Sequence, residues 1–125
     1  MGRKNVVRSY KMFDAVTIST DQSSTATNVL NLDNASIQVI WSGGGTPVGT
    51  ITIEATNIDP DLPSFDSTTD YVTLTLSGTI AVSGNSGNHS IILEEMPFYA
   101  IRLIYTSTSG TATMSAYLSS KTIGA

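Results

Sequence analysis

Apolar and polar side chains alternate along most of this chain with a period of two residues. In the clearest run, Ile37, Val39 and Trp41 are separated by Gln38 and Ile40. The same alternation recurs in segments 50–56, 71–77, 99–106 and 112–118. Because successive side chains of a β-strand point to opposite faces, this spacing predicts strands that cover a core with one face. No segment shows the 3.6-residue period of a helix, so the pattern predicts an all-β protein of antiparallel strands.

Turn signals rich in glycine, proline, asparagine and aspartate separate these runs. Gly43-Gly44-Gly45-Thr46-Pro47 is expected to form a hairpin loop, and residues 107–110 another turn. Many short strands with regular turns favour a two-sheet antiparallel sandwich of the jelly-roll kind, with a small closed barrel as the alternative. We expect about eight strands among nine segments, one of the short ones not forming a strand: 12–20, 27–32, 35–42, 48–57, 70–76, 78–83, 89–94, 98–107 and 111–119. The predicted core is Ile37, Val39, Trp41, Ile51, Ile53, Val72, Leu74, Leu76, Ile91, Leu93, Ile101, Leu103, Tyr105 and Leu118.

The first eleven residues are expected to be a basic arm, and residues 12–125 a single β-sandwich domain. Ordering such an arm costs about 1–2 kcal/mol per residue in backbone entropy, whereas each exposed ion pair returns about 0–1 kcal/mol. Charge alone therefore cannot fix the arm, which is either mobile or held by strand pairing and burial, on its own body or on a neighbouring subunit. The residues expected at a subunit contact are Arg3, Lys4, Val6, Val7, Arg8, Tyr10, Lys11, Tyr71 and Tyr117.

Charge and composition exclude several classes of partner. Residues 12–125 carry two cations against ten carboxylates, a net charge of −8, which argues against nucleic-acid binding. There is no cysteine, so no disulfide and no thiolate site can form. The first residues lack the apolar run of a signal peptide, and no stretch is long enough for a membrane helix. We therefore expect a chain that is made in a cytoplasm and binds no membrane.

No residue stands out as catalytic. His89 is the single histidine, and the neighbouring Gly84-Asn85-Ser86-Gly87 lacks the spacing of a nucleophile elbow. Glu94 and Glu95 are adjacent, so on a strand they point to opposite faces and cannot act as a catalytic pair. Glu54 projects from the polar face of its strand. We expect that the protein is not an enzyme.

No cofactor or metal site is expected either. The triple glycine lacks the lysine and following helix of a phosphate-binding loop. Four aspartates crowd the loop between Ile58 and Asp70, but their spacing does not match an EF-hand. We interpret this loop as a solvated turn, with a weak cation site as the alternative. The four aspartates are Asp59, Asp61, Asp66 and Asp70.

The aromatic residues divide between the two faces. By alternation, Trp41, Tyr99 and Tyr105 fall on core faces, whereas Tyr71 and Tyr117 fall on polar faces. The exposed pair could serve a sugar-binding platform if both lay on one face. It fits an intersubunit contact as well, because tyrosine is enriched there.

Two stretches resemble a pattern seen in small virion structural proteins of bacteriophages. The first runs from Ile37 to Trp41 and continues from Pro47 to Asn57. The second is Phe98-Tyr99-Ala100-Ile101-Arg102-Leu103-Ile104-Tyr105, which continues to Thr113. The resemblance, with the closing segment 121–124, implies a virion β-sandwich of the capsid, its decoration or its spike, and it transfers no catalytic residue.

These observations favour a non-catalytic structural subunit of a bacteriophage particle, either a capsid protein or a capsid-associated decoration protein. Such a subunit would be assembled in the host cytoplasm and would reside in the virion. Its expected partners are copies of itself, in a homo-oligomer, and other virion proteins. The alternative is a carbohydrate- or receptor-binding β-sandwich module, for example a component of a virion spike or fibre.

Overall fold

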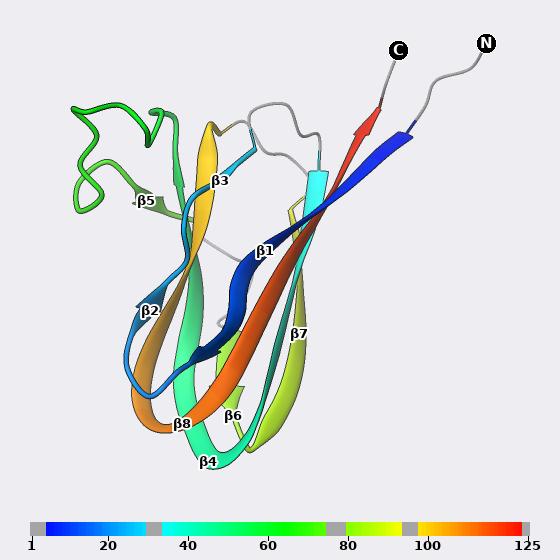
Figure 1. Cartoon of the computed structure of the whole chain (residues 1–125), viewed down its shortest axis with the longest axis vertical. Coiled ribbons are helices and arrows are strands. Elements are labelled where there is room, and N and C mark those ends of the chain that lie inside the picture. The colour runs from blue at the N-terminus through cyan, green and yellow to red at the C-terminus, as the bar shows by residue number, and fades with distance from the viewer. Residues whose placement is uncertain (1–4, 30–33, 75–79, 94–97, 124–125) are drawn as a thin grey trace.

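The computed structural model describes residues 5–29, 34–74, 80–93 and 98–123. These residues form no helix, and their strands join into one eight-stranded antiparallel sheet (Figure 1). The predictions of an all-β, antiparallel chain are confirmed. The two-sheet jelly-roll sandwich is not confirmed, because hydrogen bonds connect all strands into a single sheet. The strands are β1 (Asn5–Thr17), β2 (Gln22–Ser23), β3 (Thr27–Asn28), β4 (Asn34–Thr56), β5 (Val72–Thr73), β6 (Ile80–Ser83), β7 (Ser86–Leu93) and β8 (Ala100–Ile123).

Two long strands, β4 and β8, form the centre of the sheet. They pair antiparallel from Asn34 opposite Lys121 to Thr56 opposite Ala100. The hairpin loop predicted at 43–47 and the turn predicted at 107–110 are therefore wrong, because neither strand reverses direction there. The register instead shifts between Ser42 and Val48, as in β-bulges, which bend a strand without ending it.

The shared bend explains why these glycine-rich segments look like turns in the sequence. Gly43 and Gly110 adopt φ angles of 138° and 75°, and Thr46 has a φ of 48°. A side chain at Gly110 would collide with the backbone carbonyl oxygens of Gly45 and Thr46. The glycines thus permit two strands to bend against each other while they stay paired, as Figure 1 shows at the point where both ribbons curve round.

The bend divides the sheet into two halves, which we name by their outer strands. The β1–β7 half contains β7, residues 34–42 of β4, residues 111–123 of β8, and β1. The β3–β5 half contains residues 48–56 of β4 and 100–109 of β8, together with β2, β3, β5 and β6. Both halves contribute to one buried cluster, so the folded-over sheet encloses a single core.

Most of the predicted core is buried in this cluster. Val72 is a wrong prediction, since it is 68% exposed on β5, an edge strand of only two residues. Leu74 and Leu93 are half-buried against the cluster, and Leu76 lies outside the described residues. The remaining ten predicted core residues are buried, namely Ile37, Val39, Trp41, Ile51, Ile53, Ile91, Ile101, Leu103, Tyr105 and Leu118.

The basic N-terminal segment is part of the sheet where the structure describes it. β1 begins at Asn5 and runs without a break past Lys11 to Thr17, paired antiparallel with β8 of the same chain. Arg3 and Lys4 lie outside the described residues.

Candidate interaction surfaces

The long loop between β4 and β5 is docked on the sheet by one arginine. Arg102 projects from β8, directly opposite Glu54 on β4, and its Nε donates to Glu54 Oε1 at 2.7 Å. Its Nη2 also lies 2.6 Å from the same carboxylate oxygen and donates to the carbonyl oxygen of Ser67 at 3.1 Å. The guanidinium carbon lies 3.9 Å from the ring centroid of Tyr71. Arg102 therefore links both central strands to the loop.

Tyr71 is consequently not the exposed surface residue that the alternation predicts. It is half-buried, and Phe65 packs against it edge-on with ring centroids 5.3 Å apart. Burial raises the pKa of the Tyr71 hydroxyl, which the cation of Arg102 opposes and the carboxylate of Glu54 reinforces. A tyrosine held in this way stabilises the loop and has limited surface left for a partner.

The aspartates of the loop accept hydrogen bonds from the loop's own backbone. Asp66 Oδ1 accepts from the backbone N–H and the hydroxyl of Thr68, at 2.9 and 2.6 Å. These hydrogen bonds lower the pKa of Asp66. Asp70 Oδ2 accepts from the backbone N–H of Asp66 at 2.8 Å. No group of three carboxylates or histidines suited to a metal ion occurs among the residues that the structure describes.

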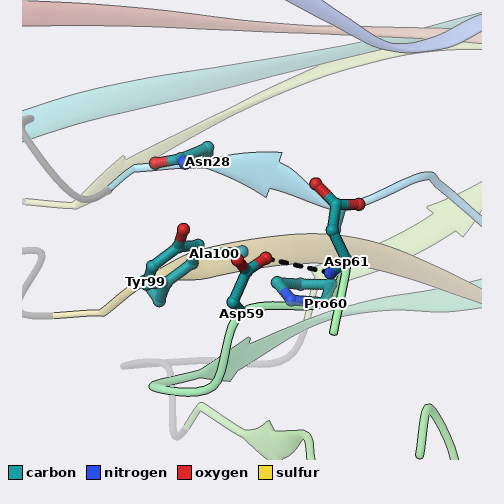
Figure 2. Close-up of a pocket in the computed structure, with 7 residues that line it drawn as sticks. Asn28, Asp59, Pro60, Asp61, Tyr99 and Ala100 are labelled. Atoms are coloured by element: carbon teal, nitrogen blue, oxygen red, sulfur yellow. Dashed lines mark hydrogen bonds between the residues drawn. The ribbon is translucent and has the colours of Figure 1, made fainter. Parts of the chain in front are cut away.

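A shallow cavity of about 60 Å³ lies where this loop meets β3 and the start of β8 (Figure 2). Asp59 and Tyr99 lie side by side in it, and Asp59 Oδ1 accepts from the backbone N–H of Asp61 at 2.9 Å. Burial, followed by the negative charge of Asp59, raises the pKa of Tyr99. Pockets for small-molecule ligands typically measure about 300–1,000 Å³, so this cavity is too small for such a ligand. Its lining residues are Ala26, Asn28, Asp59, Pro60, Asp61, Tyr99 and Ala100.

His89 lies beside the single tryptophan rather than in a catalytic arrangement. Its ring stacks on Trp41 with centroids 6.0 Å apart and an interplanar angle of 23°. Trp41 is 4% exposed, and its Nε1 donates to the carbonyl oxygen of Gly84 at 3.3 Å. A side chain at Gly87 would collide with the Trp41 ring, so this glycine permits the close packing. Glu94 and Glu95 lie outside the described residues.

The residues predicted at a subunit contact do not gather in one place. Lys11 lies directly opposite Tyr117 in the sheet, whereas Tyr71 belongs to the β3–β5 half. Tyr10 is half-buried against the core, and Lys11 forms an exposed ion pair with Asp14 at 3.3 Å. Val6, Val7 and Arg8 pair with Thr122, Lys121 and Ser120 of β8 through the backbone. Tyr71 and Tyr117 therefore do not form the common platform that sugar binding by these two residues would require.

The outer face of the β1–β7 half is polar and almost without charge. Its exposed side chains include Gln38 and Ile40 of β4 and Ser90 and Ile92 of β7. The apolar members stand out, since Ile92 is 72% exposed and Ile40 is 39% exposed. Lys11 and Asp14, which form an ion pair on β1, are the exposed charged side chains next to this face among those that the structure describes. No helix in the described part of the chain is long and apolar enough to span a membrane.

Comparison with solved structures finds two proteins with a similar fold. The structure of the SPBc2 prophage-derived protein YomS matches with a TM-score of 0.57 at 11% identity, over 93% of this chain and 95% of that one. A structure of the infectious bursal disease virus, Gx strain, matches with a TM-score of 0.52 at 13% identity, over 97% of this chain and 34% of that one. At such identities the likeness shows a shared fold. No protein-family model and no curated protein sequence matches this chain.

Proposed function

We propose that this chain is a non-catalytic structural subunit of a bacteriophage particle, a capsid protein or a capsid-associated decoration protein. The observation that carries the proposal is the shared fold with the prophage-derived protein, which extends over almost the full length of both chains. The likeness to a viral protein supports the same proposal, although the matching part is about a third of that protein's chain. The resemblance of segments 37–41, 47–57 and 98–113 to phage virion proteins agrees with both.

The surface chemistry supports binding to proteins over turnover of a small molecule. The described carboxylates of the long loop stabilise its turns, and Glu54 is held by Arg102. The cavity beside Tyr99 is too small for a typical substrate. The exposed outer face of the β1–β7 half carries mainly uncharged polar side chains and isoleucines, which can pack against a partner without desolvating charges.

Sedimentation of particles with the chain attached tests the proposal. Phage particles from cells that carry this sequence are separated on a density gradient, and the chain is detected by antibody in each fraction. We expect the chain to peak with the particles and to remain there after a salt wash. A matched sample, in which the purified chain is added to particles of an unrelated phage, should leave it at the top of the gradient. A chain found only at the top in both samples would contradict the proposal.

A further inference from the structure

The two edges of the β1–β7 half are built differently. β1 carries features that discourage strand pairing: two register shifts around Phe13, a left-handed Ala15 at φ 50°, and the exposed charges of Lys11 and Asp14. β7 has none of these over its eight residues, Ser-Gly-Asn-His-Ser-Ile-Ile-Leu. Its register with β4 is continuous from Ala35 opposite Leu93 to Ser42 opposite Ser86. β7 is thus a regular edge strand without proline, lysine or carboxylate.

The core is also open along β7. His89 and Leu93 project toward the same side of the sheet as the buried Ile91, yet His89 is exposed and Leu93 is half-buried. At the opposite edge, Met12 and Phe13 of β1 are 5% and 2% exposed. Side chains of β1 therefore cover the core at that edge, whereas side chains of β7 cover it only in part.

The backbone of β7 has a free side as well. Within the part of the chain that the structure describes, β7 pairs with β4 and with no other strand. An edge strand presents a row of N–H and C=O groups that another strand can pair with. A long, uncharged and regular edge next to an incompletely covered core is a surface built to receive a strand.

We infer that a second copy of this chain adds at this edge, with its own β7 antiparallel to the first across a two-fold axis. Two identical edges can satisfy each other because a two-fold contact is self-complementary. Each copy has a net charge of −4, so two copies approach most easily where no carboxylate is present, as on Ser86–Leu93.

Sedimentation equilibrium of the full chain, with lysine substitutions on one exposed face, tests the inference. We expect the purified wild-type chain to form a dimer. Ser90→Lys combined with Ile92→Lys should raise the dimer dissociation constant by about tenfold or more, because like charges would meet along the paired edge. The matched controls, Ile40→Lys and Ser119→Lys, place lysine on the same face but in the interior strands β4 and β8, and should change it by less than about twofold.

A cysteine scan locates the contact independently, because the chain has no cysteine of its own. Single cysteines are placed at the exposed Asn88, His89 and Ser90, with Ser9→Cys on β1 as the control. We expect at least one β7 variant to form a disulfide-linked dimer under mild oxidation and the β1 variant to remain monomeric. Cross-linking through position 9 alone, an entirely monomeric wild-type chain, or equal weakening by the Ile40→Lys control would each overturn the inference. Far-ultraviolet spectra of every variant confirm that the sheet is retained.

The inference rests on the proposed function only in that both require contacts between copies or subunits, and the two can fail separately. A monomeric chain that still sediments with particles would overturn the β7 contact and leave the virion role in place. A β7-paired dimer that never sediments with particles would do the reverse.

Discussion

At the scale of single residues, Tyr105 is the most informative side chain of the core. It is fully buried, and its hydroxyl lies near Ser107, which opposes the effect of burial on its pKa, but makes no well-formed hydrogen bond to the described residues. Burial raises the pKa of Tyr105 above its ordinary value of 10.0. The folded state therefore favours the protonated phenol, a contribution to stability that is complete below pH 10 and is lost as the pH rises further.

Tyr105→Phe removes the unpaired hydroxyl and keeps the ring. We expect its free energy of unfolding at pH 7 to equal or exceed that of the wild type, by up to about 1 kcal/mol. Between pH 10 and pH 11.5 the variant should lose less stability than the wild type, as measured by urea denaturation. The variant should still lose some stability at alkaline pH, because the pKa values of Tyr71 and Tyr99 are raised as well. For comparison, Trp41→Ala removes a buried ring and should cost about 3–5 kcal/mol. A Tyr105→Phe variant less stable than the wild type at pH 7 would contradict this account.

Sequence alternation predicted individual core positions well wherever a strand is long and has neighbours on both sides. Ile37, Val39 and Trp41 lie on β4 between β7 and β8, and all three are buried as expected. Val72 has the same local pattern but lies on a two-residue edge strand, where no neighbour covers it. Tyr71 was misjudged for another reason: its partner Arg102 lies on a distant strand, and local spacing carries no information about such a contact.

At the scale of elements, the sequence pattern did not predict the bend that β4 and β8 share. Glycine-rich segments usually end strands, and 43–47 has the composition of a hairpin loop. A strand can instead continue through such a segment when its neighbour bends at the same level. Here β8 bends beside β4 near Gly110. The presence of antiparallel strands was therefore predictable from local patterns, whereas the continuity of β4 and β8 and the folding of one sheet over itself were not.

Arg102 gives a testable prediction at this scale. Arg102→Gln removes the ion pair with Glu54 and the stacking on Tyr71, so we expect the free energy of unfolding to fall by about 1–2 kcal/mol. Amide hydrogen exchange in residues 58–71 should accelerate more than in β4 or β8, because the loop loses its attachment. Arg102→Lys is the control that keeps the charge but loses the planar stacking. Its free energy of unfolding should lie between those of the wild type and Arg102→Gln. Uniform acceleration across the sheet would show that Arg102 supports the fold rather than the loop.

At the scale of the whole molecule, the sequence predicted the all-β class, and the structure confirms it. The candidate contact surface was harder to predict from the sequence. The sequence predicted a subunit contact at the basic N-terminal segment and at Tyr71 and Tyr117. The structure pairs Asn5–Lys11 with β8 of the same chain. The incompletely covered edge at β7 became visible only from the strand order, because its eight residues contain no charge or aromatic cluster that would mark them in the sequence.

The number of copies per particle tests the central claim most directly. A structural subunit is present in a number of copies fixed by the symmetry of the particle. A protein that only adheres to the particle, or an enzyme, need not have a fixed copy number. Quantitative peptide mass spectrometry of washed particles, with isotope-labelled peptides of this chain and of the major capsid protein, gives the ratio of the two. The account predicts a constant simple ratio across preparations and across gradient fractions that contain particles. A ratio that falls toward zero on washing, or that varies between fractions, would contradict a structural role.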